Sequence, residues 1–298
     1  MSNSKKLREK LASNSIVKVC GAFDAMSAKL VESSGFDAVW SGSFAISATH
    51  GVPDASILTM TEFFDVASNM VETCKIPVIA DCDTGYGGPN NVIHMVKKYE
   101  NAGVAAVCIE DKTFPKQNSL LSGGNNQLLS EKDFAAKILA ANGAKQNNDF
   151  MIIARIEALI SGIGMDEALK RAYAYENAGA DLILIHSKKI TPEEIFEFSD
   201  LWKGKAPLVV IPTTYYSVNI DELIQHKIKM VIYANQTLRA SHLALSNLLT
   251  KMKDANNMSQ LQNQMSSMDE IFKLQEMCDV KLEEKNIEEK LRKLGYIS

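Results

Sequence analysis

The stretch that decides the fold is YENAGVAAVCIED (99–111), because it recurs in similar form as YENAGADLILIHS (175–187). A weaker copy is ESSGFDAVWSGS (32–43). Each copy reads as the end of a helix, a glycine suited to a left-handed helix cap, and a short buried strand. Repetition of this helix–glycine–strand unit is typical of a closed barrel of alternating strands and helices.

Eight short apolar runs extend this pattern along the chain, and most have few polar residues until their last positions. Strands that are buried on both faces have this composition. Helical patterns lie between them, for example at 59–74 and 164–179. The sequence therefore predicts an α/β fold of the (β/α)8 TIM-barrel type. An open doubly wound sheet is the alternative, but GAFDAMS (21–27) lacks its usual Gly-rich turn. The expected strands are IVKVCGAF (16–23), FDAVWSGS (36–43), PVIADCD (77–83), AAVCIED (105–111), FMIIARIE (150–157), DLILIHS (181–187), PLVVIPT (207–213) and MVIYANQ (230–236).

Composition narrows the function classes. The 298 residues are 46% apolar, which is enough for a sizeable core, and the net charge is −4. No long basic run and no aromatic–basic interleaving occurs, so we expect no nucleic-acid partner. No window approaches the roughly 20 apolar residues of a membrane helix, and MSNSKKLREKLASNS (1–15) lacks the apolar stretch of a signal peptide. We expect a cytoplasmic protein with reduced cysteines and no membrane partner.

The chain continues beyond the eighth strand in a way that a barrel alone does not need. Residues 237–255 read as the eighth helix, so the barrel is expected to cover about 16–255 of a single α/β domain spanning 1–298. A polar linker follows, and 268–294 read as one or two further helices in an extension at about 256–298. An apolar stripe in this extension favours contact with another subunit. Its residues are Ile271, Phe272, Leu274 and Met277.

Acidic residues end two neighbouring strands of the expected barrel. Asp81 and Asp83 follow the third strand, and Glu110 ends the fourth. In a TIM barrel these strand ends share one rim, where catalytic groups gather. Three carboxylates there repel one another unless a cation is present, and hard oxygen ligands favour magnesium. Taken singly, Asp83 could instead begin a turn and Glu110 could pair with a lysine.

Two basic side chains are expected at the same rim. Arg155 lies inside the apolar run of the fifth strand, and a buried arginine needs a carboxylate or an anionic ligand as its partner. An ion pair with Glu157, which has the same strand parity, is the alternative to a ligand. His186 ends the sixth strand and could be a satisfied barrel histidine, but beside an arginine and a metal it favours contact with an anion.

A polar segment without clear periodicity runs from Thr113 to Leu129. Loops of about 15 residues are usually functional or disordered. Its Lys116, Asn118 and Ser119 offer donors for an anion, and such a loop could close over the barrel mouth and exclude water. A plain surface loop is the alternative, since these polar residue types are common there.

The sequence resembles the phosphoenolpyruvate mutase and isocitrate lyase superfamily over nearly its whole length. In the lyase branch the mobile loop carries a catalytic cysteine motif such as KKCGH, whereas this chain has FPKQNS and no cysteine there, which disfavours a carbon–carbon lyase. The pieces that carry the resemblance are WSGSFAISATHGVPD (40–54), ADCDTGYG (80–87), EDKTFPKQNS (110–119), ARIEALISG (154–162) and ILIHSKK (183–189).

The resemblance implies a role for each matching residue. It implies magnesium bound by Asp81, with Asp83 and Glu110 reaching it partly through water. It also implies that Arg155 and His186 hold a phosphoryl group. The chain departs from the relatives' usual Trp-Gly-Ser-Gly, because it reads Trp-Ser-Gly-Ser at 40–43. The further catalytic residues implied are Asp54, Lys116 and Asn118, and the further substrate-binding residues are Trp40, Gly42, Ser43, Phe44 and Ser119.

The resemblance also implies an activity. The expected enzyme is an isomerase that interconverts phosphoenolpyruvate and phosphonopyruvate, two small anionic substrates, with Mg²⁺ as cofactor in phosphonate metabolism. Phosphonopyruvate hydrolase, which releases pyruvate and phosphate, is the alternative; mutases carry asparagine at position 118, where the hydrolase carries threonine. An oxaloacetate decarboxylase and a non-catalytic binding relative are the remaining hypotheses. The family implies a homotetramer with exchanged C-terminal helices.

Overall fold

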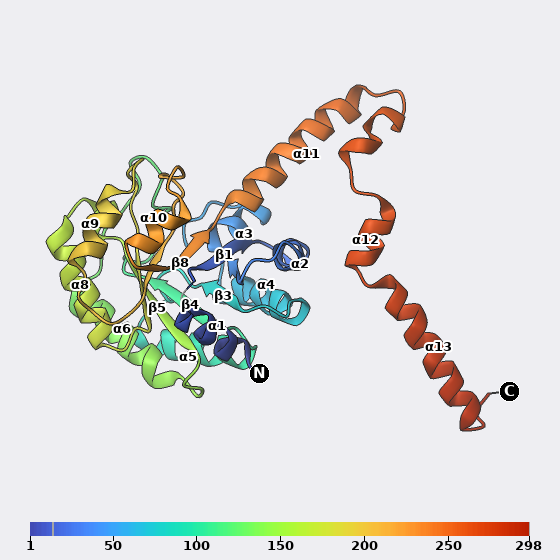
Figure 1. Ribbon diagram of the computed structural model, residues 1–298, viewed down its shortest axis with the longest axis horizontal. Coiled ribbons are helices and arrows are strands. Elements are labelled where there is room, and N and C mark those ends of the chain that lie inside the picture. The colour runs from blue at the N-terminus through green and yellow to red at the C-terminus, as the bar shows by residue number, and fades with distance from the viewer. Residues whose placement is uncertain (14, 298) are drawn as a thin grey trace. The chain divides into compact units, whose positions relative to one another are not determined.

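The computed structural model describes residues 1–13 and 15–297. These divide into two compact units, Met1–Arg239 and Ala240–Ser298. Within the first unit, eight parallel strands pair in chain order and β8 closes onto β1 (Figure 1). The predicted (β/α)8 barrel is therefore confirmed. The strands are β1 (Val17–Ala22), β2 (Ala38–Ser41), β3 (Val78–Asp81), β4 (Ala106–Glu110), β5 (Met151–Ile156), β6 (Leu182–Ile185), β7 (Leu208–Val210) and β8 (Ile228–Tyr233).

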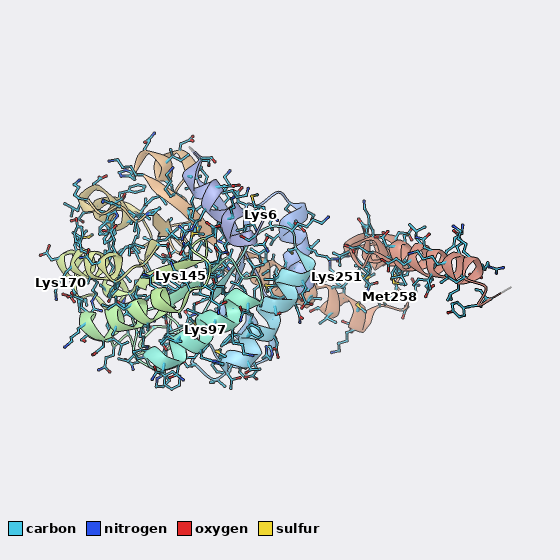
Figure 2. All side chains as sticks on the ribbon, turned by 90° about the horizontal axis from the view of Figure 1, so that it is seen from below. Lys6, Lys97, Lys145, Lys170, Lys251 and Met258 are labelled. Carbon is cyan, nitrogen blue, oxygen red and sulfur yellow. The ribbon has the colours of Figure 1, made fainter. Side chains whose placement is uncertain are left out.

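Helices surround the closed sheet, and the patterns expected at 59–74 and 164–179 are α4 and α8. The sequence did not indicate α3 and α7, two short helices that follow β2 and β5 directly. Charged side chains such as Lys97 and Lys170 cover the outer helix faces (Figure 2). The helices of the first unit are α1 (Asn3–Ala12), α2 (Ala25–Ser33), α3 (Ser43–Thr49), α4 (Met60–Thr73), α5 (Pro89–Asn101), α6 (Glu131–Ala144), α7 (Ala158–Ser161), α8 (Met165–Asn177), α9 (Glu193–Leu201) and α10 (Ile220–Gln225).

The repeated glycine has the backbone conformation that the sequence predicts. Gly103 follows α5 with φ 86°, and Gly179 follows α8 with φ 100°. Both values lie in the left-handed region, where a side chain would be strained. A Cβ at Gly179 would also lie 2.4 Å from the side chain of Asn142 on α6. The repeat therefore encodes a tight turn that leads each helix directly into the next strand.

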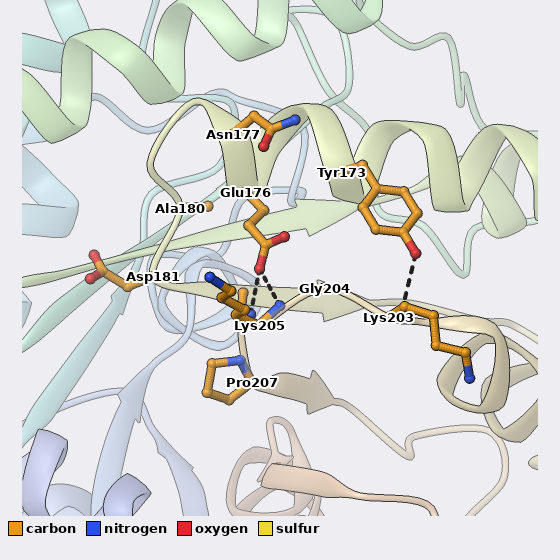
Figure 3. Close-up of a pocket in the computed structure, with 10 residues that line it drawn as sticks. Tyr173, Glu176, Asn177, Ala180, Asp181, Lys203, Gly204, Lys205 and Pro207 are labelled. Carbon is orange, nitrogen blue, oxygen red and sulfur yellow. Dashed lines mark hydrogen bonds between the residues drawn. The ribbon is translucent and has the colours of Figure 1, made fainter.

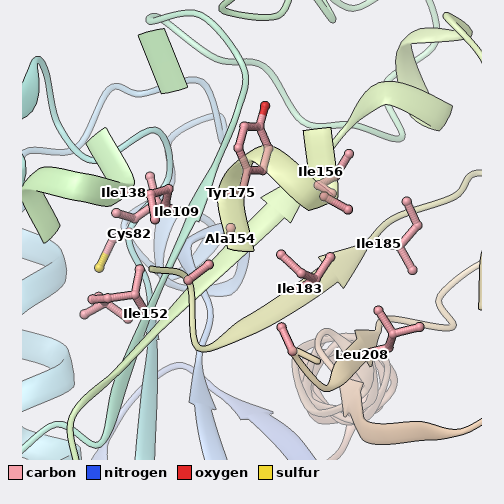
Figure 4. Packing of buried hydrophobic residues seen from close by; sticks show 14 of the residues in the cluster. Cys82, Ile109, Ile138, Ile152, Ala154, Ile156, Tyr175, Ile183, Ile185 and Leu208 are labelled. Carbon is pink, nitrogen blue, oxygen red and sulfur yellow. The ribbon is translucent and has the colours of Figure 1, made fainter. Parts of the chain in front are cut away.

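Alternate strand residues fill the barrel interior. Trp40, Ile79, Cys108, Ile153 and Leu184 belong to one buried cluster, joined by Leu7 and Leu11 of α1. The intervening residues of the same strands point outward and pack beneath the helices, as Figure 4 shows for Ile152, Ala154 and Ile156. This alternation follows from the two-residue period of a strand. It fixes which side chain faces the interior at every strand end.

At the carboxyl ends of four strands, the next position that faces the barrel interior holds a polar residue. Two residues beyond Ile79, Cys108, Ile153 and Leu184 come Asp81, Glu110, Arg155 and His186. The register pairs Glu110 directly with Arg155 across β4 and β5. The fold thus places these four side chains at one mouth of the barrel.

The second unit exposes much apolar surface. It consists of most of α11 (Gln236–Asp254), a 3₁₀ helix (Ser259–Gln264), α12 (Met268–Leu274) and α13 (Met277–Lys293). The eighth helix expected at 237–255 is α11, and the expected extension holds two α-helices. Met277, Val280, Ile287 and Leu291 are exposed and recur at helical spacing on one face of α13. None of the helices in the described ranges is long and apolar enough to cross a membrane.

We propose that a second copy of this chain covers the apolar face of α13, with the C-terminal helices exchanged between subunits. Val280→Glu combined with Ile287→Glu should then lower the oligomer mass, because it places charge in an apolar contact. Light scattering after size-exclusion chromatography measures the mass. Leu282→Glu lies off this face and is the matched control. An unchanged mass for the double variant would contradict the proposal.

Candidate active site

Two aspartates lie at the end of β3. Asp81 accepts a hydrogen bond from the Ser43 hydroxyl at 3.0 Å and a longer one from the Asp83 backbone N–H at 3.4 Å. Asp83 is buried, and its φ of 48° places it in a tight turn. Asp83 therefore lies in a turn, which was the alternative that the sequence offered, and it also lies at the candidate site. The Ser43 hydroxyl keeps a contact with the acid pair despite the departure from the family pattern.

Glu110 is buried without a full set of partners. Its Oε2 lies 3.4 Å from Arg155 Nε, but its Oε1 accepts no hydrogen bond. Burial raises the pKa of Glu110 from 4.5 to about 7, although Arg155 and Lys116 oppose this shift. The alternative in which Glu110 pairs with a lysine is not seen as a direct contact, because its ion-pair partner is Arg155. A half-partnered buried carboxylate is costly unless another cation or a proton is supplied.

The loop from Thr113 to Leu129 inserts Lys116 into the acidic side of the mouth. Lys116 is 5% exposed; its Nζ donates to Asp54 Oδ1 at 2.6 Å and lies 3.1 Å from Asp83 Oδ1. The contact with Asp83 is an ion pair without hydrogen-bond geometry, so this oxygen accepts no hydrogen bond. Burial opposes the charge on Lys116, but Asp83, Glu110 and Asp54 outweigh it and raise its pKa well above the ordinary range.

Asp54 holds a second residue of the same loop. The Asn118 amide donates to Asp54 Oδ2 at 2.8 Å, while Lys116 occupies Oδ1. The backbone N–H of Lys116 also donates to the Ser56 hydroxyl at 3.0 Å. These contacts join the segment after α3 to the loop after β4. The loop is therefore closed over the mouth in this structure.

Glu157 is the residue at the centre of the basic side of the site. It is completely buried, and its Oε1 accepts from Arg155 Nε and lies 2.8 Å from His186 Nδ1. Its Oε2 accepts from the Ser119 hydroxyl at 2.6 Å. Burial opposes ionisation of Glu157, but Arg155 and His186 outweigh it and hold the pKa well below its usual range. The sequence indicated Glu157 only as a possible partner of Arg155, and its parity with Arg155 was the available signal.

Lys112 is a site residue that sequence reasoning missed. It is 1% exposed, and its Nζ donates to the carbonyl of Gln117 and to the Ser119 hydroxyl, both at 2.8 Å. The same nitrogen lies 3.7 Å from Glu157. Lys112 follows Glu110 by two residues, so its interior position could have been inferred from strand parity. It holds the first half of the loop against the site.

His186 has one ring nitrogen between two different partners. Its Nδ1 lies 2.9 Å from Arg155 Nη2, which only donates, and 2.8 Å from Glu157 Oε1, which only accepts. One nitrogen serves only one of these partners in a given protonation state. Burial lowers the pKa of His186, against the opposing effect of Glu157. These two neighbours occupy Nδ1, and Nε2 is left for a ligand.

The predicted residues at the end of β2 and directly after it differ in how far they are buried. Trp40 is 2% exposed in the barrel interior, directly beneath Gly42: a Cβ there would lie 2.9 Å from the Trp40 ring. Phe44 is 41% exposed, in the first turn of α3. The backbone N–H groups of a first helical turn have no intrahelical partners. In this segment Ser43 contacts a predicted site residue with its side chain, through its hydrogen bond to Asp81. Gly42 and Phe44 can contribute their backbone N–H groups to a ligand.

Negative charge exceeds positive charge by two at this mouth when all the groups are ionised. In the described ranges, no group of three or more His, Cys, Asp or Glu converges closely enough to hold a metal ion alone. Two buried carboxylate oxygens, Asp83 Oδ1 and Glu110 Oε1, nevertheless lack hydrogen-bond partners. The carboxylates are Asp54, Asp81, Asp83, Glu110 and Glu157, and the cations are Lys112, Lys116 and Arg155.

A separate pocket of about 530 Å³ lies at the opposite end of the barrel, beside residues that precede β6 and β7 (Figure 3). Its Glu176 already accepts hydrogen bonds from the backbone N–H groups of Lys205 and Ala206. The Tyr173 hydroxyl likewise accepts from the backbone N–H of Lys203. This pocket holds none of the predicted site residues. Chemistry in a TIM barrel takes place at the carboxyl ends of the strands, so we assign the site there.

A closed barrel with paired acids, an arginine and a histidine at its carboxyl-end mouth defines a TIM-barrel enzyme. Residues 7–253 match the family model of phosphoenolpyruvate phosphomutase. The chain belongs to this family, as its resemblance to the mutase and isocitrate lyase superfamily implied.

Known relatives include both a hydrolase and mutases. Phosphonopyruvate hydrolase of Variovorax sp. (strain Pal2) is 41% identical over 92% of this chain and 95% of its own length. Phosphoenolpyruvate phosphomutase of Tetrahymena pyriformis is 39% identical over 94% and 93%. The crystal structure of phosphoenolpyruvate phosphomutase from Streptomyces platensis subsp. rosaceus matches with a TM-score of 0.93 and 44% identity, covering 95% of this chain and 98% of that one. A phosphonopyruvate hydrolase in complex with oxalate and Mg²⁺ matches with a TM-score of 0.89 and 38% identity over 95% and 98%.

The raised pKa of Glu110 predicts the pH dependence of stability of the metal-free protein. Between pH 4.5 and about 7 the folded state holds a proton that the unfolded state releases, so stability falls as pH rises through this window. In Glu110→Gln the free energy of unfolding should fall less over this pH range, by up to about 3 kcal/mol. Urea unfolding in EDTA at pH 5, 6 and 7 tests this, with exposed Glu288→Gln on α13 as control. Parallel pH profiles for Glu110→Gln and the parent protein would contradict the assignment.

Replacement of Glu157 should destabilise the barrel strongly. Glu157→Gln removes the carboxylate that neutralises Arg155, and breaking a buried ion pair costs about 3–5 kcal/mol. Glu131→Gln, which breaks a solvent-exposed pair with Lys170, should cost much less, because water screens such a pair. Urea unfolding measures both. Equal, small losses for the two variants would show that Glu157 does not hold the site together.

Proposed function

We propose that this protein is a phosphoenolpyruvate mutase that interconverts phosphoenolpyruvate and phosphonopyruvate. The observation that carries the proposal is the position of Asn118, whose amide is held by Asp54 within the closed loop. The amide would grip the phosphoryl group during transfer and crowd the space that a water molecule needs. A threonine at this position would leave room for water and offer it a hydroxyl.

Magnesium is the proposed cofactor. Asp83 Oδ1 and Glu110 Oε1, which accept no hydrogen bond, and the excess of two negative charges support a divalent cation. Mg²⁺ keeps several waters and uses one or two carboxylates, so the lack of a three-ligand cluster is compatible with it. Asp81 would bind it directly, and Asp83 and Glu110 would reach it through water. When bound, it would supply positive charge for the pyruvyl oxygens as the carbon–phosphorus bond breaks.

Arg155 and His186 are proposed to bind the phosphoryl oxygens. Glu157 holds both side chains, so the two groups are positioned before the substrate arrives. A phosphoryl group in transfer is metaphosphate-like, with charge spread over its oxygens. The Arg155 guanidinium and the Asn118 amide are donors suited to this charge, and His186 Nε2–H is a third donor when Nδ1 accepts from Arg155. In this arrangement the pyruvyl group turns from carbon attack to oxygen attack while the phosphoryl group stays fixed.

Exclusion of water separates a mutase from a hydrolase. If water reaches the phosphoryl group during transfer, phosphate is released and the carbon–phosphorus bond is lost. Lys116 and Ser119 are 5% and 6% exposed, so the closed loop shields the mouth. This supports sequestration of the reacting groups.

Phosphonopyruvate hydrolase is the second candidate, and one comparison favours it. The Variovorax hydrolase, at 41% identity, is slightly more similar to this chain than the Tetrahymena mutase, at 39%. Phosphorus NMR with phosphonopyruvate and Mg²⁺ separates the two activities. A mutase gives a phosphoenolpyruvate signal, and no turnover is expected in EDTA. Release of inorganic phosphate alone would contradict the mutase.

Asn118→Thr should shift the products toward phosphate. Loss of one stabilising donor reduces turnover by about a hundredfold, so phosphoenolpyruvate formation should fall by this factor while phosphate formation rises. Asn125→Thr is the matched control, because it makes the same change in an exposed part of the same loop. The phosphate-to-phosphoenolpyruvate ratio is measured by phosphorus NMR. An unchanged ratio in Asn118→Thr would refute the role of the amide.

A further inference from the structure

Asp111 lies next to Glu110 in sequence but faces the opposite way. It continues the outward positions of β4, after Val107 and Ile109, so it points toward the helices and not into the barrel mouth. It is completely buried, and its Oδ2 accepts hydrogen bonds from Arg171 Nη1 and from the Tyr175 hydroxyl, both at 2.9 Å. Asp111 is therefore not a ligand-binding acid. It forms a buried cluster with two residues of α8.

Arg171 completes this cluster with all of its nitrogen groups in use. Its Nη1 also donates to the Tyr175 hydroxyl at 3.0 Å, and its Nε donates to Glu167 at 2.9 Å. The remaining Nη2 donates to the backbone carbonyl of Leu129 at 3.0 Å. A planar guanidinium makes these contacts in fixed directions, which a lysine ammonium cannot reproduce.

The cluster contacts the candidate site at two backbone positions. Asp111 Oδ1 accepts from the backbone N–H of Glu157 at 2.9 Å, the residue that holds Arg155 and His186. Leu129 ends the loop from Thr113, and its N–H donates to the Asp111 carbonyl at 2.9 Å. Arg171 and Asp111 thus fix both the residue that orients the phosphoryl-binding groups and the end of the closing loop.

We propose that Arg171 is a positioning residue that holds the loop closed and so sets the fraction of phosphoryl groups lost to water. It acts through Asp111 and Leu129 and does not contact the substrate. The part of this inference about loss of phosphoryl groups to water rests on the proposed function. The part about Arg171 holding the loop closed does not. The two parts are therefore tested by different measurements.

Loop closure is measured by limited proteolysis with trypsin. Lys116 is the only Lys or Arg between 113 and 129, and cleavage there needs an open loop because its side chain is buried. Arg171→Lys, which keeps the charge but loses the fixed donor directions, should speed the appearance of fragments 1–116 and 117–298 about tenfold. Lys170→Met is the matched control: it is exposed, lies next to Arg171 on α8 and should leave the rate unchanged (Figure 2).

Product analysis tests the consequence for catalysis. With phosphonopyruvate and Mg²⁺, Arg171→Lys should raise the phosphate share severalfold and lower kcat more than it changes KM. A wild type that forms no phosphoenolpyruvate would defeat the proposed function but leave the proteolysis result valid. Equal cleavage at Lys116 in Arg171→Lys and wild type would overturn the positioning role. An equal increase at every tryptic site would also overturn it, because Arg171 would then only stabilise the fold.

Tyr175→Phe provides the second variant if Arg171→Lys does not fold. It keeps both charges of the cluster and removes one hydrogen bond to Asp111. Cleavage at Lys116 should be faster than in wild type, but by less than in Arg171→Lys. No change in this folded variant would overturn the proposal.

Discussion

The buried carboxylate of Glu157 is the interaction on which the rest of the site depends. An arginine, a histidine and a serine contact its two oxygens, and Lys112 lies nearby. A buried charge is tolerated only when its partners and hydrogen bonds are complete. Because Glu157 meets this condition, Arg155 and His186 are fixed in place without a ligand. The barrel therefore holds a preorganised cluster of charged side chains at one end of its strands.

Strand parity made much of this predictable from the sequence. Asp81, Glu110, Arg155 and His186 follow interior positions of four different strands, so their convergence could be inferred without coordinates. The same parity applies to Lys112 and Glu157. Lys112 was missed because it lies in a polar segment, and Glu157 was indicated only as the alternative partner of Arg155.

Other features depend on contacts that no local pattern encodes. Asp54 and Lys116 are 62 residues apart and lie in two segments without regular periodicity, so only the folded chain shows that they pair. The short helices α3 and α7 begin directly after strands, in stretches with too few residues to show a helical period. The opposite orientations of Glu110 and Asp111 were implicit in their adjacency. Their partners, however, come from other segments of the chain.

Asp54 gives each of its two oxygens to a different residue of the closing loop. A single rotation of this carboxylate would release Lys116 and Asn118 together, whereas losing either contact alone would leave the other in place. Rotation of Asp54 would therefore free this part of the loop in one step. Admission of substrate and sequestration from solvent would then depend on Asp54, in the segment that follows α3, as well as on the Arg171 cluster at the other end of the loop.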